Sequence, residues 1–151
     1  MSSVEIRRVY KGYLEVDRYL VSKQTKTRTS NSLQNWAEKR GLNDQAYFVL
    51  LFSKLEEHIN KECQKLILRK RNLRHWKSRR RWDNIEITQL DRITFMDRVS
   101  YLVDRQSHHF RDIKDLYEIR CKIAHGGVYT NPIHIPGYVN KFYNLITTLK
   151  S

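Results

Sequence analysis

The chain has 151 residues, a length typical of one domain, and a formal net charge of +13, from 29 Lys and Arg against 16 Asp and Glu. Its hydrophobic content of 40 % is too high for a disordered chain, and five Gly with two Pro exclude collagen-like or Pro/Gly-rich low-complexity sequence. The excess of cations favours a polyanionic partner, most simply a nucleic acid.

Apolar residues recur with the period of an α-helix along most of the chain. This spacing predicts about five helices, which in chain order cover about residues 3–23, 43–70, 92–103, 110–125 and 139–149. The polar residues 24–33 predict a loop, and a short additional helix over about 33–39 would end at Gly41. Residues 84–88 are the only short candidate for a strand. The predicted fold class is therefore all-α, a helical bundle.

Specific residues mark the predicted helix boundaries. Asn43 is a suitable N-cap for the second of the five helices, which is the most apolar and which we expect to be the buried centre of the fold. The pair Gly126–Gly127 ends the fourth helix, because glycine adopts the left-handed conformation that terminates helices. Pro132 and Pro136 enclose an irregular stretch before the last helix.

Hydropathy, cysteine usage and the first residues favour a soluble cytoplasmic protein with no membrane association. Residues 1–8 lack the apolar stretch of a secretory signal, and the longest apolar run, residues 46–52, is far shorter than a membrane span of about 20 residues. Cys63 and Cys121 lie far apart and predict reduced thiols. Because the chain lacks zinc-site spacings, Gly-rich nucleotide-binding motifs and GxSxG, we expect no metal and no other cofactor.

The segment LYEIRCKIAHG, residues 116–126, holds the residues best suited to catalysis. Arg120 lies on the apolar side of its predicted helix, where an arginine must pair, bind an anion or face a partner. His125 lies at the predicted helix end, where an accessible imidazole can transfer protons. Since an arginine can stabilise charge on a pentacoordinate phosphate, the pair suits metal-free cleavage of a phosphodiester.

The same two residues also have a purely structural interpretation, with the arginine bound to a carboxylate and the histidine near a helix end. Five helical residues separate Arg120 from His125 by about 140°, so they share no face unless the helix ends before His125. Moreover, cleavage by a 2′-OH needs both a base and an acid, and one chain supplies only one such histidine. A two-fold homodimer would bring two copies of each residue around one cleft.

The run LYEIRCKIAHG, late in a basic helical chain, resembles the RxxxxH motif of HEPN-domain ribonucleases. The resemblance implies a single HEPN-like helical domain over 1–151, a homodimer, and metal-independent endoribonuclease activity that leaves a 2′,3′-cyclic phosphate. It makes Arg120 the phosphate-stabilising arginine and His125 the catalytic histidine. Many relatives are toxins of toxin–antitoxin pairs or abortive-infection proteins against phage, which adds an antitoxin or regulatory protein as an expected partner.

Two positions depart from the family pattern. Many active members have a polar residue, often Asn, after the arginine, where this chain has Cys121. A toxin subfamily has a tyrosine two residues after the histidine, where this chain has Gly127, with Tyr129 two residues further. His108 and His109 precede the motif helix and either line its cleft or, more simply, cap the helix or face solvent. The candidate supporting residues are thus Cys121, Lys122, His108, His109 and Tyr129.

A basic segment at 69–82 concentrates the charge, since residues 69–81 hold eight basic residues and no acidic one. The predicted RNA-binding residues are Arg69, Lys70, Arg71, Arg74, Trp76, Lys77, Arg79, Arg80, Arg81 and Trp82. The cations suit phosphates, and the two indoles suit stacking on unpaired bases. The alternatives are a solvated basic helix end or loop with both tryptophans packed into the core, or a surface that docks an acidic antitoxin or a ribosomal surface.

Two functions follow from these residues. The first is a metal-independent endoribonuclease that cleaves RNA by 2′-OH attack at a composite homodimer site, as a toxin or anti-phage defence effector. The second is a non-catalytic RNA-binding module that docks RNA or a protein partner through its basic segment, and Cys121 after Arg120 favours it. A DNA-binding regulator is a weaker hypothesis, because the cations cluster in one segment instead of spreading along a recognition helix.

Overall fold

The computed structural model describes residues 3–126 and 129–150. These residues contain no strand, which confirms the all-α prediction and excludes the strand considered at 84–88. In chain order they form α1 (Ser3–Lys26), α2 (Ser30–Arg71), α3 (Trp76–Asp83), the 3₁₀-helix η1 (Ile87–Arg92), α4 (Phe95–Leu102), α5 (His108–Ala124) and α6 (Ile135–Thr148). No helix of this described part combines the length and the hydropathy needed to cross a membrane.

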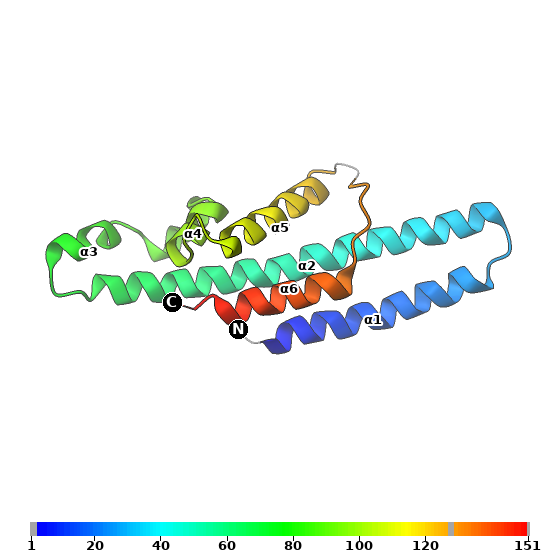
Figure 1. The fold of residues 1–151 in the computed structure, drawn as a ribbon, viewed down its shortest axis with the longest axis horizontal. Coiled ribbons are helices and arrows are strands. Elements are labelled where there is room, and N and C mark those ends of the chain that lie inside the picture. The colour runs from blue at the N-terminus through cyan, green and yellow to red at the C-terminus, as the bar shows by residue number, and fades with distance from the viewer. Residues whose placement is uncertain (1–2, 127–128, 151) are drawn as a thin grey trace.

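The central element is α2, on which the other helices pack (Figure 1). The helices α1 and α6 lie along one side of α2, and α3, α4 and α5 follow one another along the other side. The buried apolar residues of α2 recur every three or four positions: Phe48, Leu51, Phe52, Leu55, Ile59, Cys63, Leu66 and Ile67. This stripe faces both layers of neighbours, as the sequence predicts for the most apolar helix.

Aromatic rings join the two sides of α2. The ring of Phe52 lies 5.1 Å from that of Phe95 in α4 and 6.4 Å from that of Phe142 in α6. Phe95 in turn stacks on Tyr117 of α5 at 5.0 Å. Such pairs contribute about 0.5–1.5 kcal/mol each beyond the apolar area that they bury. They fix α5, and with it the catalytic candidates, against the middle of α2.

The predicted break at Gly41 is wrong, because α2 runs without interruption from Ser30 through Gly41 and Asn43. The loop is correspondingly shorter than predicted, and α1 continues to Lys26. The reason lies in tertiary packing: α1 lies along this half of α2, and Arg40 donates to the Asp17 carboxylate at 3.0 Å. These contacts offset the cost of about 1 kcal/mol of a glycine within a helix.

Other boundaries follow local capping chemistry. Gly126 has φ of 69° and ends α5 as predicted, whereas Gly127 lies outside the described residues. The helix predicted over 92–103 is divided, because the Thr94 hydroxyl accepts from the Asp97 N–H at 3.2 Å and starts α4 anew. Pro136 lies in the first turn of α6, where a missing N–H costs no helical hydrogen bond.

Two glycine substitutions test the continuity of α2 at Gly41 and the end of α5 at Gly126. Gly41→Ala should raise the free energy of unfolding by about 0.5–1 kcal/mol, because it lies within a helix and an added methyl group meets open space. Gly126→Ala should lower it by about 1 kcal/mol, because its φ is left-handed. Denaturant unfolding of both variants measures the two changes in the free energy of unfolding, which should have opposite signs. Destabilisation by Gly41→Ala would instead indicate a helix end at this position.

Candidate functional site

The catalytic candidates lie in the last two turns of α5. Ile113 and Leu116 are buried against α2 and set the orientation of the helix. Tyr117 follows on the flank, where its ring contacts Phe52 at 6.1 Å and stacks on Phe95. Arg120 is one turn further along and is half-buried. The same packing that orders α5 thus places the guanidinium at the border between core and solvent.

The Arg120 side chain has no carboxylate partner and makes no hydrogen bond within residues 3–126 and 129–150. Its charge is nevertheless felt locally, since the guanidinium opposes the rise in the pKa of Tyr117. The structural interpretation, in which an acidic side chain pairs with this arginine, therefore lacks its partner in the described part of the chain. An arginine at such a position can bind an anion supplied from outside.

His125 is exposed and follows the last residue of α5, Ala124. Its backbone N–H donates to the Cys121 carbonyl at 3.0 Å, and Gly126 then turns the chain away. The helix thus ends at Ala124, but the hydrogen bond from His125 to Cys121 still has the helical i→i−4 pattern, so His125 keeps its angular position about 140° from Arg120. No hydrogen bond joins His125 to Arg120 in the residues described.

The supporting candidates fall into separate places. Cys121 is half-buried and pairs with Tyr117 one turn back; this hydrogen bond is the main reason that the pKa of Tyr117 is raised. Lys122 is exposed. His108 and His109 lie at the start of α5 with their rings 3.8 Å apart, about 24 Å along the helix from His125. The two histidines therefore do not line a cleft with the motif of their own chain.

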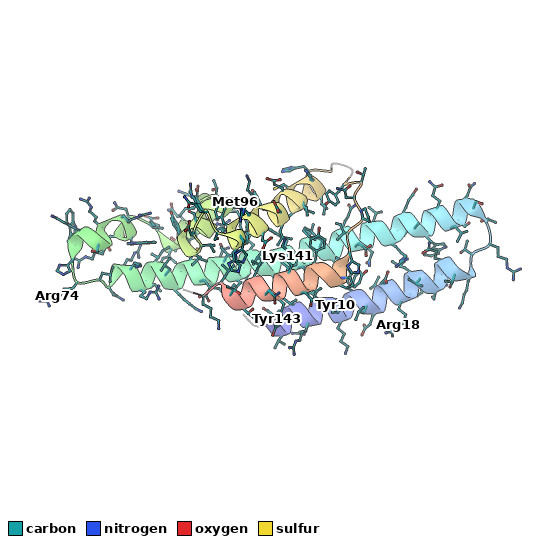
Figure 2. All side chains as sticks on the ribbon, viewed as in Figure 1. Tyr10, Arg18, Arg74, Met96, Lys141 and Tyr143 are labelled. Atoms are coloured by element: carbon teal, nitrogen blue, oxygen red, sulfur yellow. The ribbon has the colours of Figure 1, made fainter. Side chains whose placement is uncertain are left out.

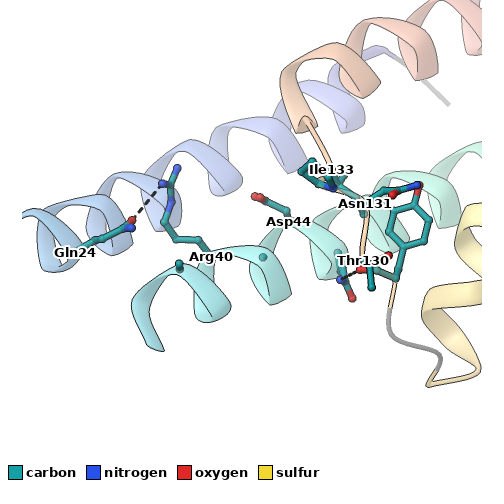
Figure 3. Close-up of a pocket in the computed structure, with 11 residues that line it drawn as sticks. Gln24, Arg40, Asp44, Thr130, Asn131 and Ile133 are labelled. Atoms are coloured by element: carbon teal, nitrogen blue, oxygen red, sulfur yellow. Dashed lines mark hydrogen bonds between the residues drawn. The ribbon is translucent and has the colours of Figure 1, made fainter. Parts of the chain in front are cut away.

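A cavity of about 320 Å³, lined by both polar and apolar residues, lies where the segment after the motif crosses α2 (Figure 3). Tyr129 belongs to its wall, and the Tyr129 carbonyl accepts from the Gln45 side chain at 3.1 Å. Arg40 reaches towards Gln24, to which it donates at 3.3 Å. The pKa of Asp44 is raised, chiefly by burial, and one of its oxygens lacks a hydrogen-bond partner. No sequence pattern marks this cavity, because its wall combines three distant segments.

The basic segment is divided between the end of α2, a turn and α3. Arg71 is half-buried and donates to the Trp82 carbonyl at 3.1 Å and to the Ile85 carbonyl, so it holds α3 against α2. Arg79 forms an ion pair with Asp83 at 3.5 Å. The other cations of the segment are mostly exposed, as Figure 2 shows for Arg74 at the end of the molecule. Most of the predicted RNA-binding charge is thus accessible, whereas Arg71 is structural.

The two tryptophans differ in their surroundings. Trp76 is 58 % exposed, and the Arg80 guanidinium lies 5.3 Å from its ring centre. Trp82 is half-buried and packs edge-on against Tyr101 of α4, with ring centres 5.7 Å apart. The alternative that both indoles pack into the core is therefore wrong for Trp76 and applies only to Trp82.

The motif and the basic segment lie at different places along α2 (Figure 1). Tyr129 is held to Gln45, whereas the basic segment begins at Arg69, about 36 Å along the same helix. His125 is four residues before Tyr129 and so at most about 14 Å from it. One chain therefore keeps the two predicted sites apart, by roughly 20 Å or more.

No group of three His, Cys, Asp or Glu side chains is placed to hold a metal ion within the described residues. Comparisons of the chain with protein-family models, with curated proteins and with solved structures find no match. The HEPN resemblance accordingly stays a prediction based on the motif and its helical context.

The two cysteines should differ sharply in reactivity. Burial raises the pKa of the Cys63 thiol to about 11, and Cys63 also donates to the Arg98 carbonyl at 3.2 Å. Since the thiolate is the nucleophile, a disulfide reagent at pH 8 should label Cys121 and leave Cys63 unmodified until the protein unfolds. A thiol titration of wild type and Cys121→Ser checks this. Rapid labelling of two thiols in the folded wild type would contradict the burial of Cys63.

Proposed function

We propose that this protein is a metal-independent endoribonuclease of the HEPN type, which cleaves RNA at a composite site formed by a homodimer. The proposal rests on one observation, the end of α5, where an arginine with no carboxylate partner among the described residues is followed five residues later by an exposed histidine. The net charge of +13 supports RNA as the polyanion. A role as a toxin or anti-phage defence effector rests on the family resemblance alone.

The chemistry needs no group beyond these side chains. His125 of one copy takes the proton of a 2′-OH, and the resulting oxygen attacks the adjacent phosphorus. Arg120 stabilises the negative charge of the pentacoordinate phosphate. The bond from phosphorus to the 5′ oxygen then breaks, and His125 of the second copy gives its proton to the leaving oxygen. The products are a 2′,3′-cyclic phosphate and a 5′-OH.

The surface near the motif supports association of two copies. Leu42, Ala46 and Leu50 are exposed and lie four residues apart on α2, so they form one apolar stripe on the half of α2 that contacts Tyr129. Leu42 alone is 66 % exposed. A symmetric partner that covers this stripe would exclude water there and place the two exposed histidines near each other.

The second candidate is a non-catalytic RNA-binding module. Two observations favour it: the basic segment lies roughly 20 Å or more from His125, and Cys121 is engaged by Tyr117 at a position where the family often has a polar residue. Such a module would bind RNA with a strong dependence on salt and leave it intact, and His125→Ala would not change its affinity.

Cleavage of a labelled RNA in EDTA tests the nuclease. Arg120→Ala and His125→Ala should each lower the rate at least about 100-fold, because they remove charge stabilisation and proton transfer. Gel analysis should show products that end in a 2′,3′-cyclic phosphate. DNA of the same sequence should stay intact because it lacks the 2′-OH.

Matched controls separate loss of chemistry from loss of fold or charge. Arg18 is an exposed arginine on α1 (Figure 2), and His134 is an exposed histidine whose side chain makes no capping hydrogen bond. Arg18→Ala and His134→Ala should retain the wild-type rate. Cleavage that survives both motif substitutions would refute the site, and salt-dependent binding with no cleavage by the wild type would select the second candidate.

A further inference from the structure

A groove of about 370 Å³ lies at the junction of α2, α3, α4 and the segment that follows α6. Its lining residues are Leu66, Arg69, Lys70, Trp82, Tyr101, Leu102 and Lys150. Three of them are cations, two are aromatic and none is acidic. The guanidinium of Arg81 also lies 5.4 Å from the centre of the Trp82 ring. The groove therefore combines uncompensated positive charge with flat apolar rings.

Buried contacts hold the elements of the groove in place. His58 of α2 is 5 % exposed, and its Nε2 donates to the Leu149 carbonyl at 2.7 Å. This hydrogen bond fixes the chain after α6 and brings Lys150 beside Arg69. On the other side, Arg71 holds the backbone of Trp82 at 3.1 Å. The groove is thus assembled from distant parts of the chain and does not depend on a mobile surface loop.

We propose that this groove binds an unpaired nucleotide of an RNA strand, with its phosphate at the cations and its base against the Tyr101 and Trp82 rings. The inference rests on the proposed function and names the strand-holding site for the same substrate. Cations alone suit any polyanion, but aromatic rings beside them suit a nucleobase, because every base can stack on a flat ring. An acidic peptide would use Arg69 and Lys150 and gain nothing from the rings.

The position of the groove restricts the RNA. Arg69 lies about 36 Å from Gln45 along α2, and the groove is therefore roughly 20 Å or more from His125. Stacked nucleotides advance about 3.4 Å each, so roughly six nucleotides of a stacked strand, or fewer of an extended strand, separate the held nucleotide from the cleaved bond. In a homodimer whose two motifs share one cleft, the distance from His125 to the groove of the same chain would be unchanged. The substrate is therefore an RNA long enough to reach both places.

Binding of an eight-residue oligouridylate to the full-length His125→Ala protein tests the groove without cleavage. The double variant Arg69→Gln/Lys150→Gln should weaken binding about tenfold and reduce the salt dependence by about 0.7 per lost phosphate contact. The double variant Lys11→Gln/Arg18→Gln, which removes two exposed charges from α1, should have no effect beyond about twofold. Equal weakening by the control would overturn the site in favour of general electrostatic attraction.

The aromatic part of the groove has its own test. Tyr101→Leu should weaken oligouridylate binding at least about fivefold with an unchanged salt dependence, whereas Tyr101→Phe, which keeps the ring, should bind like the parent protein. Thermal unfolding verifies that both variants fold. Polyglutamate of equal charge should be insensitive to Tyr101→Leu. No base occupies the groove if Tyr101→Leu binds oligouridylate with the affinity of the parent protein. The same conclusion holds if its affinity for polyglutamate falls by the same factor as its affinity for oligouridylate.

The experiments give different results when the groove proposal is wrong and when the nuclease proposal is wrong. If the groove is wrong but the nuclease is right, Arg69→Gln/Lys150→Gln leaves RNA cleavage unchanged while His125→Ala abolishes it. If the nuclease is wrong, the groove substitutions still weaken RNA binding although wild type cleaves nothing. Cleavage of a dinucleotide, which cannot span the two places, at the full wild-type rate would also contradict the required separation.

Discussion

Burial of one apolar stripe along α2 is the constraint on which the rest of the structure depends. A helix of 42 residues is about 63 Å long and gains little stability from its backbone alone. The stripe from Phe48 to Ile67 is covered by α1 and α6 on one side and by α4 and α5 on the other. Because each fully buried apolar side chain contributes about 1.5–3 kcal/mol, this stripe decides where every neighbouring helix lies.

Local signals in the sequence were enough for part of the fold. The apolar period identified the central helix, and Gly126 marked the end of the motif helix, because both depend only on neighbouring residues. The continuity of α2 through Gly41 was not predictable in this way. It depends on α1 lying beside α2 and on the Arg40–Asp17 ion pair, which joins residues far apart in the chain.

The residues of the candidate site also fall into two groups: those that the local sequence identifies and those that only the tertiary structure reveals. Spacing alone singled out Arg120 and His125, but only the fold shows that Arg120 forms no ion pair within the described residues. The sequence pattern did not identify Tyr101 and Lys150, because neither residue lies in the basic segment at 69–82. Lys150 joins Arg69 only through the buried hydrogen bond of His58 to the chain beyond α6. Residues that act together through such long-range packing leave no pattern in a single sequence.

Because α2 is unbroken between Gln45 and Arg69, the distance between these two residues is fixed. One inserted residue would lengthen α2 by about 1.5 Å but turn everything beyond it by 100°, which would carry the buried stripe out of the core. Seven inserted residues would nearly restore the angle, to within about 20°, and add about 10 Å. The span of this protein can therefore change only by insertions close to a whole number of turns, such as seven or eleven residues.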